Sequence, residues 1–307
     1  MRIGIDLGGT KIEGIVMGAG SAIRHRRRVA TPRDSYEDTV AAVVQLVRDL
    51  ERDAGAQRLP VGLGTPGSLS PVSGLMRNAN SVCLNGQPLK QAIEAELGRP
   101  VRMANDANCL AVSEAADGAA AGADVVFAAI LGTGCGGGLS IAGRPRDGLN
   151  GVGGEWGHNP LPWPRADWGE VPGPRCWHGL QGCQEIWLSG TGLAGEHLRR
   201  TGQALSGEEI VAQADRPECA ETLNRYYDRL ARALASVINL LDPDVIVLGG
   251  GASRIEAIYA EVPRRWGQWV FSDQVSTPLR PALHGDSSGV RGAAWLWPEI
   301  SAEPTQK

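Results

Sequence analysis

The sequence predicts an α/β protein in which one structural unit occurs twice. At 307 residues, the chain is about twice the length of an ordinary domain. A short apolar run, a glycine-rich turn and a second apolar run follow one another at residues 3–16, and the same arrangement recurs from Val125 onward. Strand-like runs alternate with helical periodicity elsewhere in the chain. We therefore expect a duplicated α/β fold with two lobes and a central cleft.

The first half of the chain is predicted to open with three strands, at 2–7, 12–17 and 23–29. A helix is expected over 34–54, because its valines and leucines recur at helical spacing, and Ser35 is a suitable cap. The pattern then predicts a strand at 61–64, a turn at Pro66–Gly67, a helix over 89–97, a strand at 101–103 and a helix from about Ala107.

The second half begins with a buried-type strand at 125–131, the glycine-rich loop 132–138 and a strand at 139–142. Residues 160–175 are rich in proline and tryptophan and are expected to form a loop. The remaining predicted elements are a long helix over 219–241, a strand at 245–248 that ends in a glycine turn and is followed by a helix, and a last helix over 288–296.

Composition excludes some functional classes. The net charge is −4 and the pI is about 5.8, which does not favour a nucleic-acid or anionic-membrane surface. The arginines between Arg24 and Arg28 are interpreted as a solvated hairpin. The chain goes from Met1 directly into a strand and has no apolar run of about 20 residues, so we expect a cytoplasmic protein without a signal peptide. Its six cysteines are then reduced, and clustered ones indicate a metal.

The two glycine-rich turns are interpreted as phosphate-binding hairpins. Without Cβ atoms, their amide N–H groups can approach a phosphate closely, and Asp6 can hold Mg²⁺ directly or through water. A strand follows Gly137, which excludes a Rossmann dinucleotide site, and no Gly-Lys-Ser/Thr sequence indicates a P-loop. A plain tight hairpin is the alternative. The predicted nucleotide contacts are Gly4, Asp6, Gly8, Gly9, Thr10, Lys11, Gly132, Thr133, Gly134, Cys135, Gly136, Gly137, Gly250 and Gly251.

Four potential metal ligands lie close together in the sequence. Cys176, His178 and Cys183 have the spacing of zinc-binding turns, and His158 lies upstream of the proline-rich loop. Two thiolates and two imidazoles predict a closed, structural Zn²⁺ site. The alternative is a coincidental grouping of cysteine and histidine in a loop.

Three acidic residues are candidates for chemistry on a sugar. Asp106 lies at the start of a predicted helix, where it serves as an N-cap, as a general base that takes the proton from a sugar hydroxyl, or as both. Glu155 and Glu185, with His158 beside the metal site, suit the vicinal hydroxyls of a sugar. A solvated surface charge is the alternative for either glutamate.

Several motifs together resemble the ROK family of sugar kinases and related repressors. They are Asp6-Leu7-Gly8-Gly9-Thr10-Lys11, Asn105-Asp106-Ala107-Asn108, Gly132-Thr133-Gly134, Gly154-Glu155-Trp156-Gly157-His158 and the segment 176–185. The chain is most similar to the bacterial fructokinases of this family, also described as manno(fructo)kinases, on residues 78–81, 84–89 and 284–295. The family more often has cysteine where this chain has His178.

The resemblance implies the actin-like, ribonuclease-H-type fold. It implies an N-terminal lobe over 1–116, to which a C-terminal helix at about 288–307 returns, and a larger lobe over 117–287 that carries the zinc loop. It also implies that Asp106 is the catalytic base and His158 the first zinc ligand. The sugar contacts it implies are Gly67, Asn80, Asn105, Asp106, Glu155, His158 and Glu185.

The activity implied is ATP-dependent phosphorylation of D-fructose, with mannose or glucose as further acceptors, at the 6-hydroxyl. Mg²⁺ and structural Zn²⁺ are the expected metals, and a homodimer is the expected assembly. An N-acetylglucosamine kinase or glucokinase of the same family is the alternative. A sugar-responsive repressor and a non-catalytic sugar-binding module are less favoured, because the first hairpin begins at residue 3 and Asp106 and both hairpins are intact.

Overall fold

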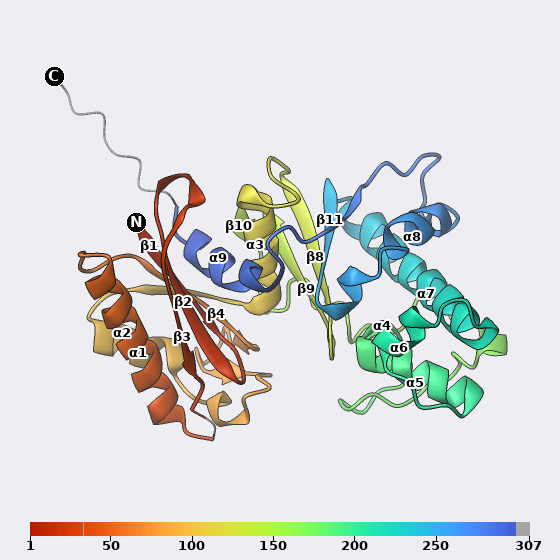
Figure 1. The fold of residues 1–307 in the computed structure, drawn as a ribbon, viewed down its shortest axis with the longest axis horizontal. Helices are drawn as coiled ribbons and strands as arrows, with labels where there is room; N and C mark the ends of the chain where they lie inside the picture. The colour runs from red at the N-terminus through yellow and green to blue at the C-terminus, as the bar shows by residue number, and fades with distance from the viewer. Residues whose placement is uncertain (33, 299–307) are drawn as a thin grey trace. The chain divides into compact units, whose positions relative to one another are not determined.

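The chain forms two compact units in a computed structural model that describes residues 1–32 and 34–298 (Figure 1). Unit 1 consists of Met1–Gly122, Gly138–Gly153 and the segment from Asp286 onward, and unit 2 of Ala123–Gly137 and Gly154–Gly285. The lobe boundary near residue 116 that the sequence suggests remains a prediction.

Unit 1 is built on a five-stranded sheet of order β3-β2-β1-β4-β7. The strands are β1 (Arg2–Leu7), β2 (Lys11–Met17), β3 (Ile23–Ala30), β4 (Val61–Thr65) and β7 (Val101–Asn105). The first three are antiparallel neighbours, whereas β4 and β7 run parallel to β1. Minor elements are η1 (Ala19–Ser21), β5 (Ser68–Leu69), β6 (Met76–Arg77) and η2 (Val82–Leu84). All five strands of the sheet lie where the sequence predicts them, with ends that differ by one or two residues.

Helices cover both faces of this sheet. Figure 1 shows α1 (Tyr36–Asp53) and α2 (Leu89–Leu97) on one face, where their apolar side chains form the main core with those of β1 and β2. The Oγ of Ser35 accepts a hydrogen bond from the Asp38 N–H at 3.2 Å, as the predicted cap requires. The opposite face carries α3 (Asp106–Asp117) and the C-terminal helix α9 (Ser288–Trp295).

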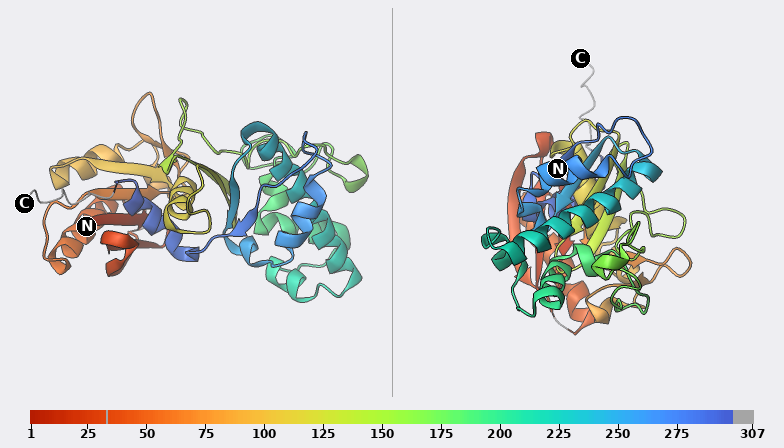
Figure 2. Two further views of the ribbon diagram at one scale, coloured as in Figure 1. Left: turned by 90° about the horizontal axis from the view of Figure 1, so that it is seen from above. Right: turned by 90° about the vertical axis from the view of Figure 1, so that its right-hand side faces the viewer.

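The contact of α9 with the sheet depends on glycine. A Cβ atom on Gly4 would lie 2.2 Å from the carbonyl oxygen of Val290, and one on Gly62 would lie 1.8 Å from that of Ala293. Figure 2 shows the same helix, in blue, beside the red strands of unit 1. Gly4 thus belongs to the packing of α9 in the middle of β1, and the hairpin tip begins only at Gly8.

A second five-stranded sheet has the order β10-β9-β8-β11-β12. Its strands are β8 (Val125–Leu131), β9 (Cys135–Ile141), β10 (Arg144–Pro145), β11 (Val245–Gly249) and β12 (Leu279–Pro281). As in the first sheet, three consecutive strands are followed by two later strands that run parallel to the first of them. The border between the units passes through β9.

Unit 2 contains most of the helical residues of the second half. The helices are α4 (Glu185–Leu188), α5 (Gly190–Thr201), α6 (Gly207–Ala212), α7 (Pro217–Leu241) and α8 (Ile258–Trp266), with 3₁₀ turns η3 (Ala166–Trp168) and η4 (Gly251–Arg254) in unit 2 and η5 (Gly285–Ser287) at its border. The long helix α7 is the central one, since α4, α5, α6 and α8 all pack on it. None of the helices in the described ranges is long and apolar enough to cross a membrane.

Two predictions about the second half are wrong in detail. The strand expected at 139–142 already begins at Cys135, so Gly136, Gly137 and Gly138 are strand residues. These glycines leave room for neighbours: a Cβ on Gly138 would lie 2.1 Å from the carbonyl oxygen of Ala107. The helix expected directly after Gly251 is a 3₁₀ turn, and α8 begins only at Ile258. The two five-stranded sheets repeat one strand order, which agrees with the predicted duplication of an α/β unit.

Candidate functional site

The first predicted phosphate hairpin has an open tip. β1 and β2 are joined through Gly8, Gly9 and Thr10, and the Gly8 N–H donates to the Lys11 carbonyl at 3.0 Å. Gly9, Thr10 and Lys11 are exposed. The Thr31 hydroxyl holds the turn from the side by donating to the Gly8 carbonyl at 2.7 Å. The tip thus presents exposed backbone, as phosphate binding requires.

Asp6 lies at the end of β1, in an environment that opposes its charge. Burial, then the negative charges of Asp106 and Glu13, raise the pKa of Asp6 to about 6. The carboxylate is enclosed by small residues: a Cβ on Gly289 would lie 3.2 Å from its Oδ2. A half-buried carboxylate beside a second one is stabilised by a cation, so this donor set fits Mg²⁺.

Asn105 and Asp106 occupy the junction of β7 and α3. The Asn105 side chain is the true N-cap, because its Oδ1 accepts from the Asn108 N–H at 2.8 Å. Asp106 is the first residue of α3, its Oδ1 accepts from the Ala107 N–H at 2.8 Å, and it remains partly open to solvent. Surrounding protein atoms nevertheless displace enough water to raise the pKa of Asp106. The cap role that we considered for Asp106 therefore belongs mainly to Asn105.

The parallel strands explain why these groups meet. Asp6 is paired with Gly64 across β1 and β4, and Thr65 is paired with Asn105 across β4 and β7. The carboxyl ends of the three parallel strands therefore form one edge, the usual position of a ligand site in such sheets. The structure thus brings together Asp6, Asn105 and Asp106, which are far apart in the sequence.

Two further predicted sugar contacts lie in the segment after β4. Gly67 has a φ of 74°, and a Cβ there would lie 2.7 Å from the Ala79 amide nitrogen, so Gly67 is close to the chain next to Asn80. Asn80 is exposed and lines a small cavity of about 240 Å³ with Gly9 and Ser81. Gly67, Asn80 and the first hairpin are thus parts of one region of unit 1.

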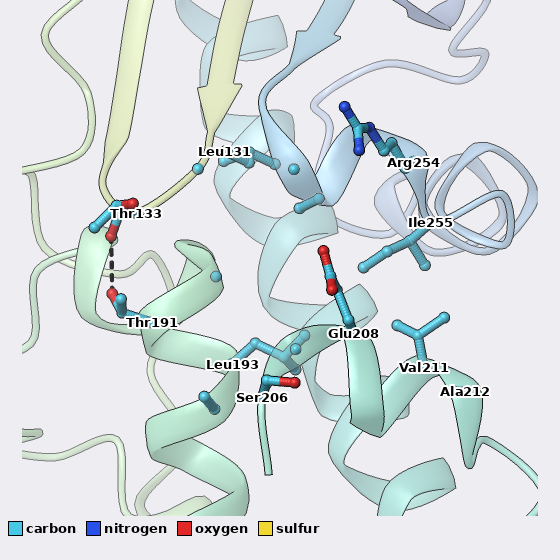
Figure 3. Close-up of a pocket in the computed structure, with 16 residues that line it drawn as sticks. Leu131, Thr133, Thr191, Leu193, Ser206, Glu208, Val211, Ala212, Arg254 and Ile255 are labelled. Atoms are coloured by element: carbon cyan, nitrogen blue, oxygen red, sulfur yellow. Dashed lines mark hydrogen bonds between the residues drawn. The ribbon is translucent and has the colours of Figure 1, made fainter. Parts of the chain in front are cut away.

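The second hairpin, in unit 2, is tied to α5 at its base. The Gly132 N–H donates to the Gly134 carbonyl at 3.0 Å, and the Gly190 N–H donates to the Gly132 carbonyl at 2.7 Å. The Thr191 hydroxyl donates to the Thr133 carbonyl at 2.8 Å (Figure 3). Gly250, whose φ is 81°, touches the same place, because a Cβ on it would lie 2.7 Å from the Leu131 carbonyl. The turn after β11 and this hairpin therefore lie together, as expected if both contact one nucleotide.

A cavity of about 730 Å³ opens beside this hairpin. Its walls come from the hairpin, α5, α6 and η4, and they are mainly apolar, with Leu131, Leu193 and Ile255 among them (Figure 3). The carboxylate of Glu208 points into the space between these side chains (Figure 3). An apolar cavity of this size with a few polar groups, next to a phosphate-type turn, suits a nucleoside.

Glu155 and His158 belong to a segment that packs on β9. The Trp156 indole donates to the Gly136 carbonyl at 2.9 Å, and its ring lies edge-on to Phe127, with centroids 5.4 Å apart. A Cβ on Gly157 would lie 1.9 Å from the Cys135 carbonyl oxygen, so only glycine fits there. Glu155 is exposed and His158 half-buried beside this anchor.

The four predicted metal ligands converge. His158, Cys176, His178 and Cys183 offer one ligand atom each, and these atoms all lie within 4.8 Å of one another. The Sγ of Cys176 is 3.7 Å from His158 Nδ1, and that of Cys183 is 3.7 Å from His178 Nε2. Ligands of a tetrahedral zinc ion lie roughly 3.3–3.8 Å apart, given bond lengths near 2.0–2.3 Å. The cluster therefore fits a closed zinc site, and zinc occupancy remains a prediction.

Glu185 lies between the metal cluster and the second hairpin. One carboxylate oxygen accepts from the Cys135 N–H at 3.1 Å, and the other accepts from the indole N–H of Trp177 at 2.9 Å. A Cβ on Gly134 would lie 2.8 Å from the first oxygen. The absence of a side chain at Gly134 thus makes space for Glu185 rather than only for a phosphate.

Some residues of the site were missed by the sequence analysis. The cavity walls from α5 and α6, including Thr191 and Glu208, carry no motif of their own. The serine before each helix was an available signal, because Ser189 and Ser206 each accept from an N–H of the first turn. Trp177, which contacts Glu185, was visible only as part of the cysteine-rich segment.

Known proteins similar to this chain include sugar kinases, which agrees with a site that suits a nucleotide and a sugar. Residues 2–300 match the model of the ROK family. The chain is 39% identical over 300 residues to an N-acetyl-D-glucosamine kinase of Pectobacterium atrosepticum, which covers 96% of this chain and 98% of that protein.

Solved structures of ROK proteins are similar to this chain over nearly its whole length. A ROK hexokinase from Thermus thermophilus is 32% identical with a TM-score of 0.85, covering 96% of this chain and 97% of that one. A ROK family glucokinase from Streptomyces griseus, in complex with glucose and AMPPNP, is 29% identical with a TM-score of 0.74, covering 95% and 97%. Because the family model matches residues 2–300, nearly the whole of this chain, the chain belongs to the ROK family.

Proposed function

We propose that this chain is an ATP-dependent sugar kinase that phosphorylates N-acetyl-D-glucosamine at its 6-hydroxyl. The observation that carries the kinase assignment is the edge of unit 1 at which Asp106 comes close to Asp6, near the end of the strand that leads into an exposed glycine hairpin. The choice of sugar rests on the relatives, since proteins 38–39% identical over 300 residues are named N-acetyl-D-glucosamine kinases.

Asp106 is the proposed general base. Its carboxylate takes the proton from the 6-hydroxyl while that oxygen attacks the γ-phosphorus of ATP, and the bond to ADP breaks. The raised pKa of Asp106 suits this role, because a more basic carboxylate accepts a proton more readily. Asn105, which caps the same helix, fixes the start of α3 and with it the position of the base.

Each glycine hairpin is proposed as a phosphate contact, and the nucleoside is proposed to occupy the cavity beside Thr133 in unit 2. The amide groups of the turns would donate to phosphate oxygens, where negative charge increases in the transition state. Asp6 would hold Mg²⁺, which neutralises phosphate charge when bound. A structure of a 29% identical glucokinase with AMPPNP supports a nucleotide site in this fold.

Glu155, His158 and Glu185 are proposed to bind the sugar hydroxyls. His158 is also a ligand of the proposed zinc site, so a zinc ion on one ring nitrogen would fix the orientation of the other. The zinc site is structural in this proposal, because four protein ligands leave no open position.

D-Fructose, which the sequence motifs favour, is the second candidate substrate. The residues 78–81, 84–89 and 284–295 support it, whereas the names of the relatives support the alternative sugar. Glucose is a third acceptor to be tested, since a 29% identical relative is named a glucokinase.

A coupled assay of ADP release over N-acetyl-D-glucosamine, D-fructose, D-glucose and D-mannose tests the proposal. We expect the largest kcat/KM with N-acetyl-D-glucosamine. A larger value with fructose would replace the proposed sugar and keep the kinase. Absence of ADP release with every sugar, from protein that binds them in calorimetry, would favour a non-catalytic regulator.

A further inference from the structure

Trp177 is an exposed aromatic residue that contacts proposed sugar and metal groups. Its side chain is 77% exposed, so core packing does not explain its position. Among the residues that the structure describes, its ring and hydrogen-bond contacts are with Glu185, His158 and His178. The indole lies edge-on to His158, with centroids 5.2 Å apart and planes at 85°.

The indole N–H is one of two donors that bind the Glu185 carboxylate, one on each oxygen. Trp177 Nε1 donates to one oxygen of Glu185 at 2.9 Å, and the Cys135 N–H donates to the other at 3.1 Å. Two donors on different oxygens fix both the position and the plane of the carboxylate. A carboxylate has about four acceptor positions, so each oxygen keeps one for a ligand hydroxyl.

We propose that Trp177 is a positioning residue for sugar binding, which acts by holding the Glu185 carboxylate in the orientation that accepts sugar hydroxyls. This inference rests on the proposed function, because it takes Glu185 as a sugar contact. Side chains that are preorganised for a ligand need not be ordered when it binds, and the affinity gains accordingly. The ligand class is a sugar with adjacent free hydroxyl groups.

The direct test is Trp177→Phe, which removes the N–H donor and keeps an aromatic ring. We expect the Kd of the preferred hexose, measured by calorimetry, to rise about 10- to 100-fold, as for a lost hydrogen bond to a charged group. KM for the sugar should rise in parallel, whereas kcat and KM for ATP should change less than about threefold, since the base and the Cys135 contact remain. Trp163→Phe is the matched control, because Trp163 is 45% exposed and stacks on Trp269 instead.

A double-mutant cycle separates this role from a structural one. In the Glu185→Ala background, Trp177→Phe should lose most of its effect, because the residue acts through that carboxylate. Trp177→Gln, which restores an N–H donor, should recover part of the affinity. Zinc content and melting temperature, measured on all variants, should match the Trp163→Phe control.

Three results would overturn the inference. The first is an unchanged Kd in Trp177→Phe, and the second is a loss of sugar affinity from Trp177→Phe that is equally large in the Glu185→Ala background. The third is a Trp177→Gln variant that binds the sugar no better than Trp177→Phe, whether or not the two variants are less stable than the wild type. A wild-type protein that neither binds nor phosphorylates any hexose would instead reject the proposed function.

Discussion

The carboxylate of Asp106 lies close enough to that of Asp6 to raise its pKa, an effect second only to burial. The two residues are brought together by the parallel strands β1, β4 and β7, whose pairing places the end of each strand at one edge. Two neighbouring carboxylates destabilise the folded protein, because like charges at short range repel. The pair therefore indicates a site that is complete only with a cation.

Replacing Asp6 by asparagine is expected to stabilise the protein at neutral pH. The pKa of Asp6 is raised from an ordinary value of 3.8 to about 6, so its contribution to stability is fully present below about pH 3.8 and is lost as the pH rises through 6. Asp6→Asn should therefore be more stable than the wild type at about pH 8, by up to about 3 kcal/mol, and nearly equal at about pH 4. Urea unfolding at both pH values measures this.

Asp38→Asn is the control for this experiment, since Asp38 is exposed at the start of α1. It should be no more stable than the wild type at either pH. An Asp6→Asn variant that is less stable than the wild type at about pH 8 would show that the Asp6 carboxylate is satisfied by the protein alone.

The same titration predicts weaker Mg²⁺ activation in acid. Below a pKa of about 6, each pH unit lowers the ionised fraction of Asp6 about tenfold, so the Mg²⁺ concentration for half-maximal rate should rise between about pH 8 and pH 5. In Asp6→Asn the constant should be high at all pH values. Initial rates at fixed ATP measure it, and parallel pH profiles in both proteins would contradict a role for Asp6.

Asp106→Asn is expected to separate catalysis from binding. The substitution keeps the shape of the residue and its position at the start of α3 but removes the base, so kcat should fall roughly 10²- to 10⁴-fold. The Kd for the sugar should change less than about threefold. Stopped-time ADP assays and calorimetry provide the two numbers. Turnover near that of the wild type would refute the role of Asp106.

The cysteine–histidine cluster predicts about one zinc ion per chain, since four ligands of the preferred types converge. Elemental analysis of purified protein should find it, and Cys183→Ala should abolish it. His178→Cys should retain the metal, because zinc accepts either donor. Cys83→Ser is the control, as Cys83 lies outside the cluster and is half-buried. Wild-type protein without zinc would reject the site.

Local patterns were sufficient to predict much of this fold. The hairpin of β1 and β2, the helix α1 and the junction before Asp106 are determined by residues that are neighbours in the sequence. Strand alternation, helical spacing and caps such as Ser35 are short-range properties, and the structure agrees with them. The convergence of the four potential zinc ligands also followed from their closeness in the sequence, between His158 and Cys183.

The parts of the fold and of the site that the sequence did not predict depend on contacts between segments that are distant in the sequence. Gly4 suggested a phosphate contact, but its missing side chain makes room for Val290 of α9. Likewise Gly138, expected in a loop, is a strand residue whose missing side chain makes room for Ala107. The cavity beside Thr133 is assembled from separate helices, so no single segment signals it. A glycine in a sequence can indicate that another group packs closely against the backbone, but the sequence does not show whether that group is a ligand or another segment of the chain.

A buried network of ion pairs around Glu170 predicts where a substitution destabilises unit 2. Glu170, in the proline-rich loop, is fully buried and accepts from Arg229 at 2.7 Å and from Arg232 at 2.9 Å. Burial raises the pKa of Glu170, but the Arg232 and Arg229 guanidinium groups and the Arg165 N–H outweigh it and lower the pKa overall. This contribution to stability is thus present above the ordinary pKa of 4.5 and is lost as the pH falls through the lowered value.

Glu170→Gln is therefore expected to destabilise the protein by about 3–5 kcal/mol at neutral pH, because two buried guanidinium groups lose their counter-charge. The variant should also lose less stability than the wild type on acidification, since the titrating group is gone. Urea unfolding measures both effects, with Glu256→Gln as the exposed control. A change below about 1 kcal/mol would mean that Asp228 and Glu196, which also pair with these arginines, are sufficient to hold the loop onto α7.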